Sequence, residues 1–311
     1  NEITVSPSKE YVFDYWTIND GTPQYGEPRL EFNLANVTSR EAGGKGVNVS
    51  RVLGALGERN VALGFVAGSN GAMLEGALQQ MGVHTDFIRL PEGQTRINVK
   101  LYGEQETELN APGPVVSHQQ TEGLLKDLSR LQEDDLLCLC GSLPPGMEAD
   151  SYARMLTAVK ERARVIVDTS GEALLCALKE KPWLVKPNRD ELAALVGKEL
   201  PSIEDVIEAA EWLREKGAEN VLVSMGKDGA LLCAEGVRLY QPAPDGEVVG
   251  TVGAGDSLVA GFAAGWQRYG DMAQALRLGV ACGSATACCE GLADSEGVEI
   301  MLAKMPEMIE V

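Results

Sequence analysis

The pattern of apolar and polar positions indicates short strands in parts of the N-terminal third of the chain and an alternation of strands and helices from about residue 135 onward. Short β-like patches lie at Ile3–Val5, Tyr11–Phe13 and Arg29–Val37. The alternation of Ile97, Val99 and Leu101 predicts a further strand with one exposed face. Because these segments do not fit the helix–strand alternation of the remaining chain, we expect them to form a small, discontinuous β lid from about 1–40 and 95–110.

Most of the remaining chain alternates short apolar strands with helices whose apolar residues recur at helical spacing. Predicted strands cover Val61–Val66, Asp135–Cys140, Val165–Val167, Trp183–Val185, Val221–Ser224 and Ala230–Cys233. Predicted helices open at Gly43–Gly46 and cover about 150–163, 174–178, 190–196, 203–216, 254–268 and 272–289. This alternation predicts an α/β fold with a mostly parallel sheet covered on both faces. We expect residues 1–311 to form a single domain that carries the lid.

Composition narrows the classes of partner. The 311 residues carry a formal net charge of −19, which disfavours binding to nucleic acid or to anionic membranes. Any phosphate ligand therefore needs cations placed locally. The seven cysteines include no C-x-x-C pair and there are two histidines, so buried reduced thiols are favoured over a metal site. With no apolar run of about 18 residues and no signal peptide, we expect a cytoplasmic protein.

A glycine-rich loop, Gly250–Ser257, lies between a predicted strand and a predicted helix. Its glycines let the backbone approach a ligand, and the free N–H groups at the helix start favour an anion. A carboxylate at the same place repels phosphate, but Asp256 fits there as a base that accepts a proton from an attacking hydroxyl. The alternative is an ordinary N-terminal cap. The sequence contains neither a G-x-x-x-x-G-K-[ST] motif nor a G-x-G-x-x-G after an early strand.

A second glycine cluster, Ala42–Arg51, opens another predicted helix. It offers backbone donors together with the amine of Lys45 and the amide of Asn48. Taken alone, the cluster indicates either a phosphate or polyol site or a turn with a solvated lysine.

Both loops, together with Cys140–Gly146, Lys186–Glu191 and Val223–Gly229 in that order, resemble the PfkB-type (ribokinase-like) carbohydrate kinases. The match covers nearly the whole chain. The resemblance implies a three-layer α/β/α sandwich, transfer of a phosphoryl group from ATP to an alcohol, a requirement for Mg²⁺, and a homodimer formed through the lid.

The resemblance also implies residue roles. Asp256 matches the catalytic base, and the backbone N–H groups of Gly253, Ala254 and Gly255 match the anion hole for the transferred group. Asn188 and Glu191 match the family motif that orients Mg²⁺ and its bound waters. Matched nucleotide-side positions are Lys186, Asn188, Glu191, Ser224, Gly226, Gly229, Thr251 and Val252.

Thr95–Lys100 and the lysine of the Gly-Gly loop resemble family members whose acceptor already bears a phosphate, above all fructose 1-phosphate and next tagatose 6-phosphate. Matched or expected acceptor positions are Glu10, Arg29, Gly43, Gly44, Lys45, Asn48, Arg96, Asn98 and Ser142. Ser6–Glu10 departs from the family, in which an Asp holds the sugar hydroxyls; Glu10 is expected to replace it. This departure keeps open a silent sugar-phosphate-binding regulator as the alternative to an enzyme.

Overall fold

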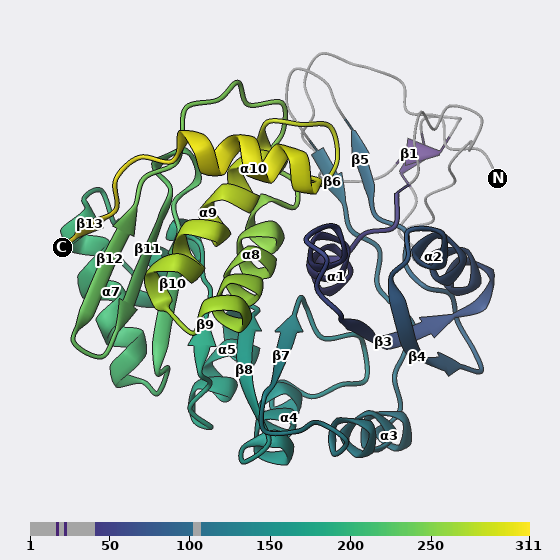
Figure 1. The fold of residues 1–311 in the computed structure, drawn as a ribbon. Helices are drawn as coiled ribbons and strands as arrows, with labels where there is room; N and C mark the ends of the chain where they lie inside the picture. Colours follow the sequence, from purple (N-terminus) through teal and green to yellow (C-terminus); the bar gives the residue numbers. More distant parts are fainter. Residues whose placement is uncertain (1–16, 19–21, 24–40, 102–106) are drawn as a thin grey trace. The chain divides into compact units, whose positions relative to one another are not determined.

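The computed structural model describes residues 17–18, 22–23, 41–101 and 107–311 (Figure 1). The chain divides into two compact units, Asn1–Glu41 and Ala42–Val311. In the first unit, the described residues form an antiparallel pair of strands, β1 (Thr17–Ile18) and β2 (Thr22–Pro23). The strands predicted at residues 3–5, 11–13 and 29–37 lie outside the described residues.

The second unit is built on a sheet with the strand order β13-β12-β11-β10-β9-β8-β7. Its strands are β7 (Asp135–Cys140), β8 (Ala163–Asp168), β9 (Leu184–Val185), β10 (Asn220–Ser224), β11 (Ala230–Ala234), β12 (Val237–Gln241) and β13 (Ile309–Glu310). Strands β7 to β10 are parallel, and β10 to β13 pair antiparallel. Two smaller ladders accompany it: parallel β3 (Val61–Ala67) with β4 (His84–Leu90), and antiparallel β5 (Val99–Leu101) with β6 (Thr107–Leu109).

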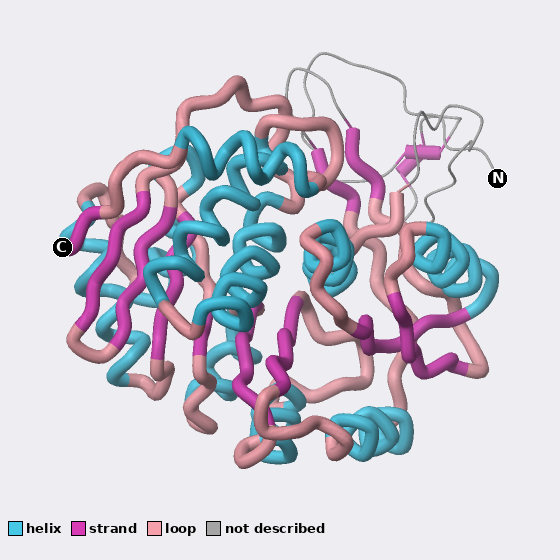
Figure 2. Tube along the Cα trace, in the orientation of Figure 1, coloured by secondary structure: helices cyan, strands magenta, loops and turns pink. Residues whose placement is uncertain are grey.

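Helices cover the two faces of this sheet (Figures 1 and 2). One face carries α3 (His118–Leu128), α4 (Ser151–Val159), α5 (Gly171–Leu178), α6 (Arg189–Val196) and α7 (Ile203–Glu215). The other carries α1 (Lys45–Ala55), α8 (Ala254–Tyr269), α9 (Met272–Ala287) and α10 (Ser295–Lys304). Helix α2 (Gly68–Gln80) contacts β3 and β4. Among the described residues, no helix combines the length and apolar character required to cross a bilayer.

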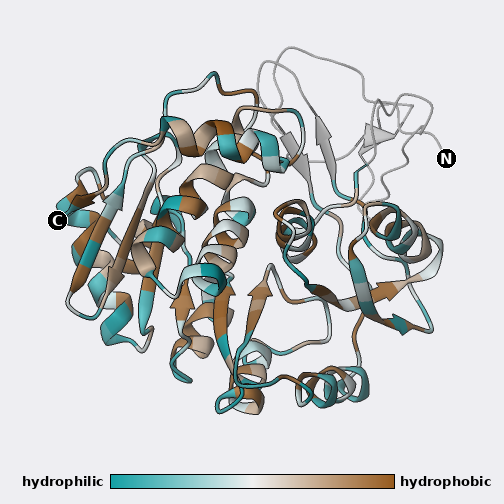
Figure 3. Ribbon diagram, viewed as in Figure 1, coloured by the Kyte–Doolittle hydropathy of each residue, from teal (hydrophilic) through white to brown (hydrophobic). Residues whose placement is uncertain are grey.

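Alternation of side chains along the central strands creates the two cores. In β8, Val165 and Val167 pack with the α3–α7 layer, whereas Ile166 packs with the α8–α9 layer. Successive side chains of a strand point to opposite faces, so a continuously apolar strand must be covered on both sides. The apolar colouring of the inner strands in Figure 3 follows this arrangement. The predicted three-layer α/β/α sandwich is thereby confirmed.

Some predicted boundaries are wrong. The helix predicted to reach residue 163 ends at Val159, because Arg162 closes a turn on the Val159 carbonyl and strand β8 starts at Ala163. The last predicted helix ends at Ala287 rather than 289, where Cys288 leaves helical geometry. Ile97 is exposed and lies before β5 instead of within it. All seven cysteines are free thiols; Cys233 and Cys282 are buried, and the other five are partly buried.

The parallel strands bring four chain segments to one edge of the sheet. The N–H of Gly141, after β7, donates to the carbonyl of Asp168, and the N–H of Lys186, after β9, donates to that of Val167. The N–H of Ser224, at the end of β10, donates to the carbonyl of Pro187. In open α/β sheets, ligands bind outside the carboxyl ends of the strands. This edge of the sheet, which faces the starts of α1 and α8, is therefore the expected ligand-binding site.

Candidate active site

Asp256 lies in the first turn of helix α8, and its side chain is only 8% exposed. The N-cap of that helix is Gly253, whose left-handed backbone (φ 80°) suits glycine, and it makes no side-chain capping bond. Asp256 therefore does not serve as the ordinary N-terminal cap that the sequence left open. Its carboxylate instead faces the start of helix α1.

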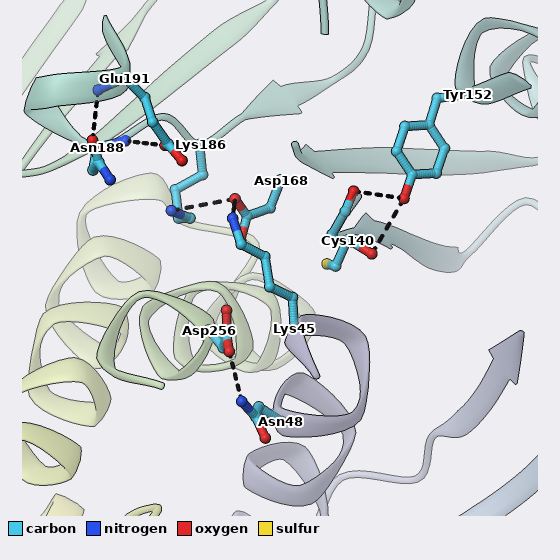
Figure 4. A network of polar contacts seen from close by, with 10 residues as sticks. Lys45, Asn48, Cys140, Tyr152, Asp168, Lys186, Asn188, Glu191 and Asp256 are labelled. Atoms are coloured by element: carbon cyan, nitrogen blue, oxygen red, sulfur yellow. Dashed lines mark hydrogen bonds and ion pairs between the residues drawn. The ribbon is translucent and has the colours of Figure 1, made fainter. Parts of the chain in front are cut away.

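The partner of Asp256 on α1 is Asn48, whose Nδ2 donates to Asp256 Oδ2 at 2.7 Å (Figure 4). Burial raises the pKa of Asp256 to about 6; the hydrogen bond from Asn48 opposes this rise, Asp168 adds to it, and the cations of Lys45 and Lys186 oppose it. A carboxylate with a pKa close to neutrality both exists in its basic form and holds a proton well. The site thus contains a group suited to general-base catalysis.

A second buried carboxylate, Asp168, joins two lysines at the end of β8. Its Oδ1 lies 2.9 Å from Lys45 Nζ and 3.4 Å from Lys186 Nζ. Its Oδ2 is buried and has no hydrogen-bond partner in the described part of the chain. Figure 4 shows the two ammonium groups reaching Asp168 from different elements, Lys45 from the start of α1 and Lys186 from the segment after β9.

This cluster of two amines and one carboxylate supplies positive charge inside an acidic protein. Burial alone lowers the pKa of Lys45, but the carboxylates of Asp168, Glu191 and Asp256 outweigh it and raise that pKa. Lys186 is only 4% exposed, so its charge acts in a low-dielectric setting. Lys45 and Lys186 are therefore the locally placed cations that a phosphate ligand requires in a chain of net charge −19.

Sequence reasoning missed Asp168. A signal was present, because Val165–Val167 was predicted as a buried strand and Asp168 follows it at its carboxyl end. The strand pattern alone could not show that Lys45, 123 positions away, would reach the same carboxylate.

Asn188 and Glu191 form a reciprocal capping box at the start of α6. The Asn188 side chain accepts from the Glu191 N–H at 2.7 Å, and Glu191 Oε2 accepts from the Asn188 N–H at 2.8 Å. The box occupies one oxygen of the Glu191 carboxylate and fixes the position of that side chain. The negative charge of Glu191 helps to raise the pKa of Lys45. The role of both residues at Mg²⁺ remains a prediction.

The donor set fits a hard cation. Mg²⁺ prefers a few carboxylate oxygens and keeps several waters. The unpartnered Oδ2 of Asp168 and the second oxygen of Glu191 meet that preference at the same edge of the sheet. No group of three or more His, Cys, Asp or Glu side chains with metal-binding geometry occurs among the described residues. Two carboxylate oxygens suit an ion that keeps most of its own waters.

The predicted nucleotide-side residues of the β10–β11 connection lie beside Asn188. Ser224 forms a parallel β-bridge with Asn188. Gly226 adopts a left-handed backbone, and a side chain at Gly229 would overlap the carbonyl oxygen of Gln241. Thr251 and Val252 are exposed in the segment directly before α8. The structure thus groups Ser224, Gly226 and Gly229 in one turn and places Thr251 and Val252 in another loop.

The residues predicted to contact the acceptor lie on several separate segments of the chain. Gly43 and Gly44 precede α1, with Gly44 as its N-cap. Arg96 Nη1 lies 3.5 Å from Ser142 Oγ on the surface, and Asn98 is exposed before β5. Glu10 and Arg29 lie outside the described residues. Asn48, predicted as a sugar contact, donates a hydrogen bond to Asp256.

Tyr152 on α4 holds the chain where β7 ends. The sequence analysis did not identify this residue. Its hydroxyl donates to the carbonyls of Cys140 and Gly141 at 3.2 and 3.0 Å. Gly141 has a left-handed backbone (φ 92°) and faces the Lys45 side chain. Tyr152 therefore positions the chain where β7 enters the site.

Comparisons with known proteins agree with this geometry. Residues 14–297 match the family described as pfkB family carbohydrate kinase. A 1-phosphofructokinase of Bacillus subtilis (strain 168) is 39% identical over 304 residues, covering 97% of each chain. One of Escherichia coli (strain K12) is 37% identical over 284 residues, covering 89% of this chain and 90% of that protein.

A solved structure adds the fold. The tetrameric inhibited form of phosphofructokinase-2 from Escherichia coli has a TM-score of 0.80 and 31% identity, covering 91% of this chain and 93% of that one. The fold and site define a phosphotransferase that acts on a sugar hydroxyl. The chain belongs to the pfkB family of carbohydrate kinases. The predicted family, fold and reaction class are confirmed.

Proposed function

We propose that the chain is a 1-phosphofructokinase-type enzyme that transfers the γ-phosphoryl group of MgATP to the C6 hydroxyl of fructose 1-phosphate, giving fructose 1,6-bisphosphate and ADP. The observation that carries the proposal is Asp256, a buried base with a pKa of about 6 beside a pair of lysines. Two relatives with the name 1-phosphofructokinase, similar over most of their length, support the choice of sugar.

In this mechanism Asp256 Oδ accepts the proton of the acceptor hydroxyl as that oxygen attacks the γ-phosphorus. Asn48 holds the carboxylate in place through its 2.7 Å hydrogen bond. The N–H groups of Gly253, Ala254 and Gly255 begin helix α8, so they and the helix dipole stabilise negative charge on the transferred group. No base other than Asp256 is required.

The two lysines divide the site between donor and acceptor. Lys186 lies on the nucleotide side with Ser224, Gly226 and Gly229, and we assign it to the phosphates of ATP. Lys45 starts α1 on the acceptor side, and we assign it to the sugar phosphate and the transferred group. Arg96, Ser142, Asn98, Gly43, Gly44, Glu10 and Arg29 complete the proposed acceptor site, and Thr251 with Val252 the nucleotide site.

Asp168 balances both amines before the substrates bind. Its unpaired oxygen, together with Glu191 and its neighbour Asn188, would hold the hydrated Mg²⁺ that accompanies ATP. When bound, this ion neutralises charge on the nucleotide phosphates.

We also propose a homodimer formed through the lid. Two-stranded ladders such as β5–β6 are marginally stable alone and leave unpaired edges, which pairing with a second copy covers. Light scattering at micromolar concentration tests this assembly, and a monomer there contradicts it.

The test of function is ADP release coupled to a second enzyme, with fructose 1-phosphate, fructose 6-phosphate, tagatose 6-phosphate and fructose as acceptors. We expect the highest kcat/KM with fructose 1-phosphate. A higher value with tagatose 6-phosphate reassigns the sugar while keeping the base. Measurable sugar-phosphate binding without ADP release from any acceptor favours the silent regulator and overturns the proposal.

A further inference from the structure

The turn between β10 and β11 is attached to the rest of the site at three points. The hydroxyl of Tyr240, on β12, donates to the carbonyl of Asp228 at 2.7 Å. Gly229 lies so close to the backbone of residues 241–243 that a side chain there has no room. The third attachment is the Asp228 side chain, which reaches Arg189 on α6.

Arg189 spans two neighbouring strand ends. It is the first residue of α6, directly after the capping-box residue Asn188. Its Nη1 lies 3.2 Å from Asp228 Oδ2, and its Nη2 lies 3.4 Å from the sulfur of Met225. The planar guanidinium thus contacts the turn both at its start and near its end, as a lysine amine could not.

The middle of this turn is exposed to solvent. Gly226 and Lys227 are exposed, whereas Met225 and Gly229 on either side are buried. Gly226 has a left-handed backbone with open space around its Cα. An exposed turn of this kind moves easily unless its flanks are held, and Asp228, the residue next to Lys227, is the flank that Arg189 holds.

We propose that Arg189, through its ion pair with Asp228, is a positioning residue that sets the affinity of the enzyme for its nucleotide. The inference rests on the proposed function, in which this turn contacts ATP. Arg189 connects the turn to the segment Lys186–Asn188, so both halves of the nucleotide site keep one relative geometry. The acceptor site, on the Lys45 side, is independent of the pair.

The ion pair is partly exposed, with side-chain exposures of 30% for Arg189 and 43% for Asp228, so its effect is modest. Arg189→Lys and Asp228→Asn are each expected to weaken binding of MgADP by about fivefold. The double variant is expected to bind no more weakly than either single variant, because both changes break the same contact. In turnover, the KM for ATP rises while kcat and the KM for fructose 1-phosphate stay close to wild type.

Titration calorimetry with MgADP on the full chain measures this binding without turnover. Arg238→Lys is the matched control, because Arg238 on β12 makes a comparable surface ion pair, at 3.0 Å, with Glu211 on α7. Binding of MgADP within twofold of wild type in both Arg189→Lys and Asp228→Asn overturns the inference, as do additive losses in the double variant. Wild-type protein that binds no MgADP refutes the proposed function instead, so the two failures are distinguishable.

Discussion

Asn48 Nδ2 lies 2.7 Å from Asp256 Oδ2, and the two residues are 208 positions apart in the chain. Their hydrogen bond joins the first turns of helices α1 and α8. The two helices also pack against each other. The base is thus oriented by the same loop that was predicted to bind the sugar. The two glycine clusters form one catalytic unit.

Asp256→Asn is expected to lose most turnover while keeping nucleotide binding. The amide accepts no proton at neutral pH, and general-base catalysis contributes about 10²–10⁴ in rate. The amide oxygen can still accept the bond from Asn48, so the helix start is preserved. Measured kcat should fall by about that factor, with the dissociation constant of MgADP close to wild type. Near-normal turnover contradicts the assignment of the base.

Asn48→Ala is expected to change the pH dependence of the reaction. In wild type, kcat/KM should rise with pH through about 6, as Asp256 loses its proton. Removing the Asn48 hydrogen bond takes away an interaction that lowers the pKa of Asp256, so the midpoint should move to higher pH. The pH profile of kcat/KM for fructose 1-phosphate measures it; an unchanged midpoint with reduced rate speaks for a sugar contact alone.

Asp256 should also affect stability. Because its pKa rises from 3.8 in the unfolded chain to about 6 on folding, its ionisation costs stability, on the order of 3 kcal/mol above pH 6 and nothing below pH 4. Asp256→Asn removes this cost. The difference in Tm between variant and wild type should therefore grow by several degrees between pH 4.5 and pH 8. A constant difference across that window would falsify the effect.

Asp168→Asn should release the two lysines from their shared partner. Without that carboxylate, the pKa of Lys45 falls, since Asp168 is the leading influence that raises it against burial. An amine-reactive reagent at pH 8, followed by mass spectrometry, should label Lys45 faster in the variant. Turnover should fall by at least about tenfold, because the lysines repel each other where they contact phosphate. Equal labelling and equal kcat argue against this role.

Gly253→Ala and Gly250→Ala form a matched pair. Gly253 has φ 80° and faces Leu292, so alanine there should cost about 1–2 kcal/mol and displace the N–H groups at the start of α8. Gly250 has open space around it, and alanine is expected to be tolerated. Thermal denaturation and kcat should separate the two variants. Equal behaviour indicates that the left-handed turn at Gly253 does not position the anion hole.

Local patterns in the sequence predicted a large part of this fold. Strands such as Val165–Val167 and helices such as α7 have apolar residues at a spacing that their own geometry requires. Helices α2, α3 and α10 were not assigned, nor were strands such as β4 and β12. Strand β4 alternates weakly, and α2 contains three glycines, Gly68, Gly71 and Gly76, which lower helix propensity.

The sequence by itself determined the chemistry of the two glycine loops, because the backbone freedom of Gly253 and the presence of a carboxyl group at Asp256 are local properties, whereas burial in the folded protein sets the pKa of that group. It also determined the family, because the motifs occur in order along the chain. Only the tertiary structure decided that Asn48 orients Asp256, that Asp168 joins Lys45 to Lys186, and that Arg189 reaches Asp228. Each of these contacts depends on which strand ends and helix starts become neighbours, and long-range packing sets that adjacency rather than any local pattern.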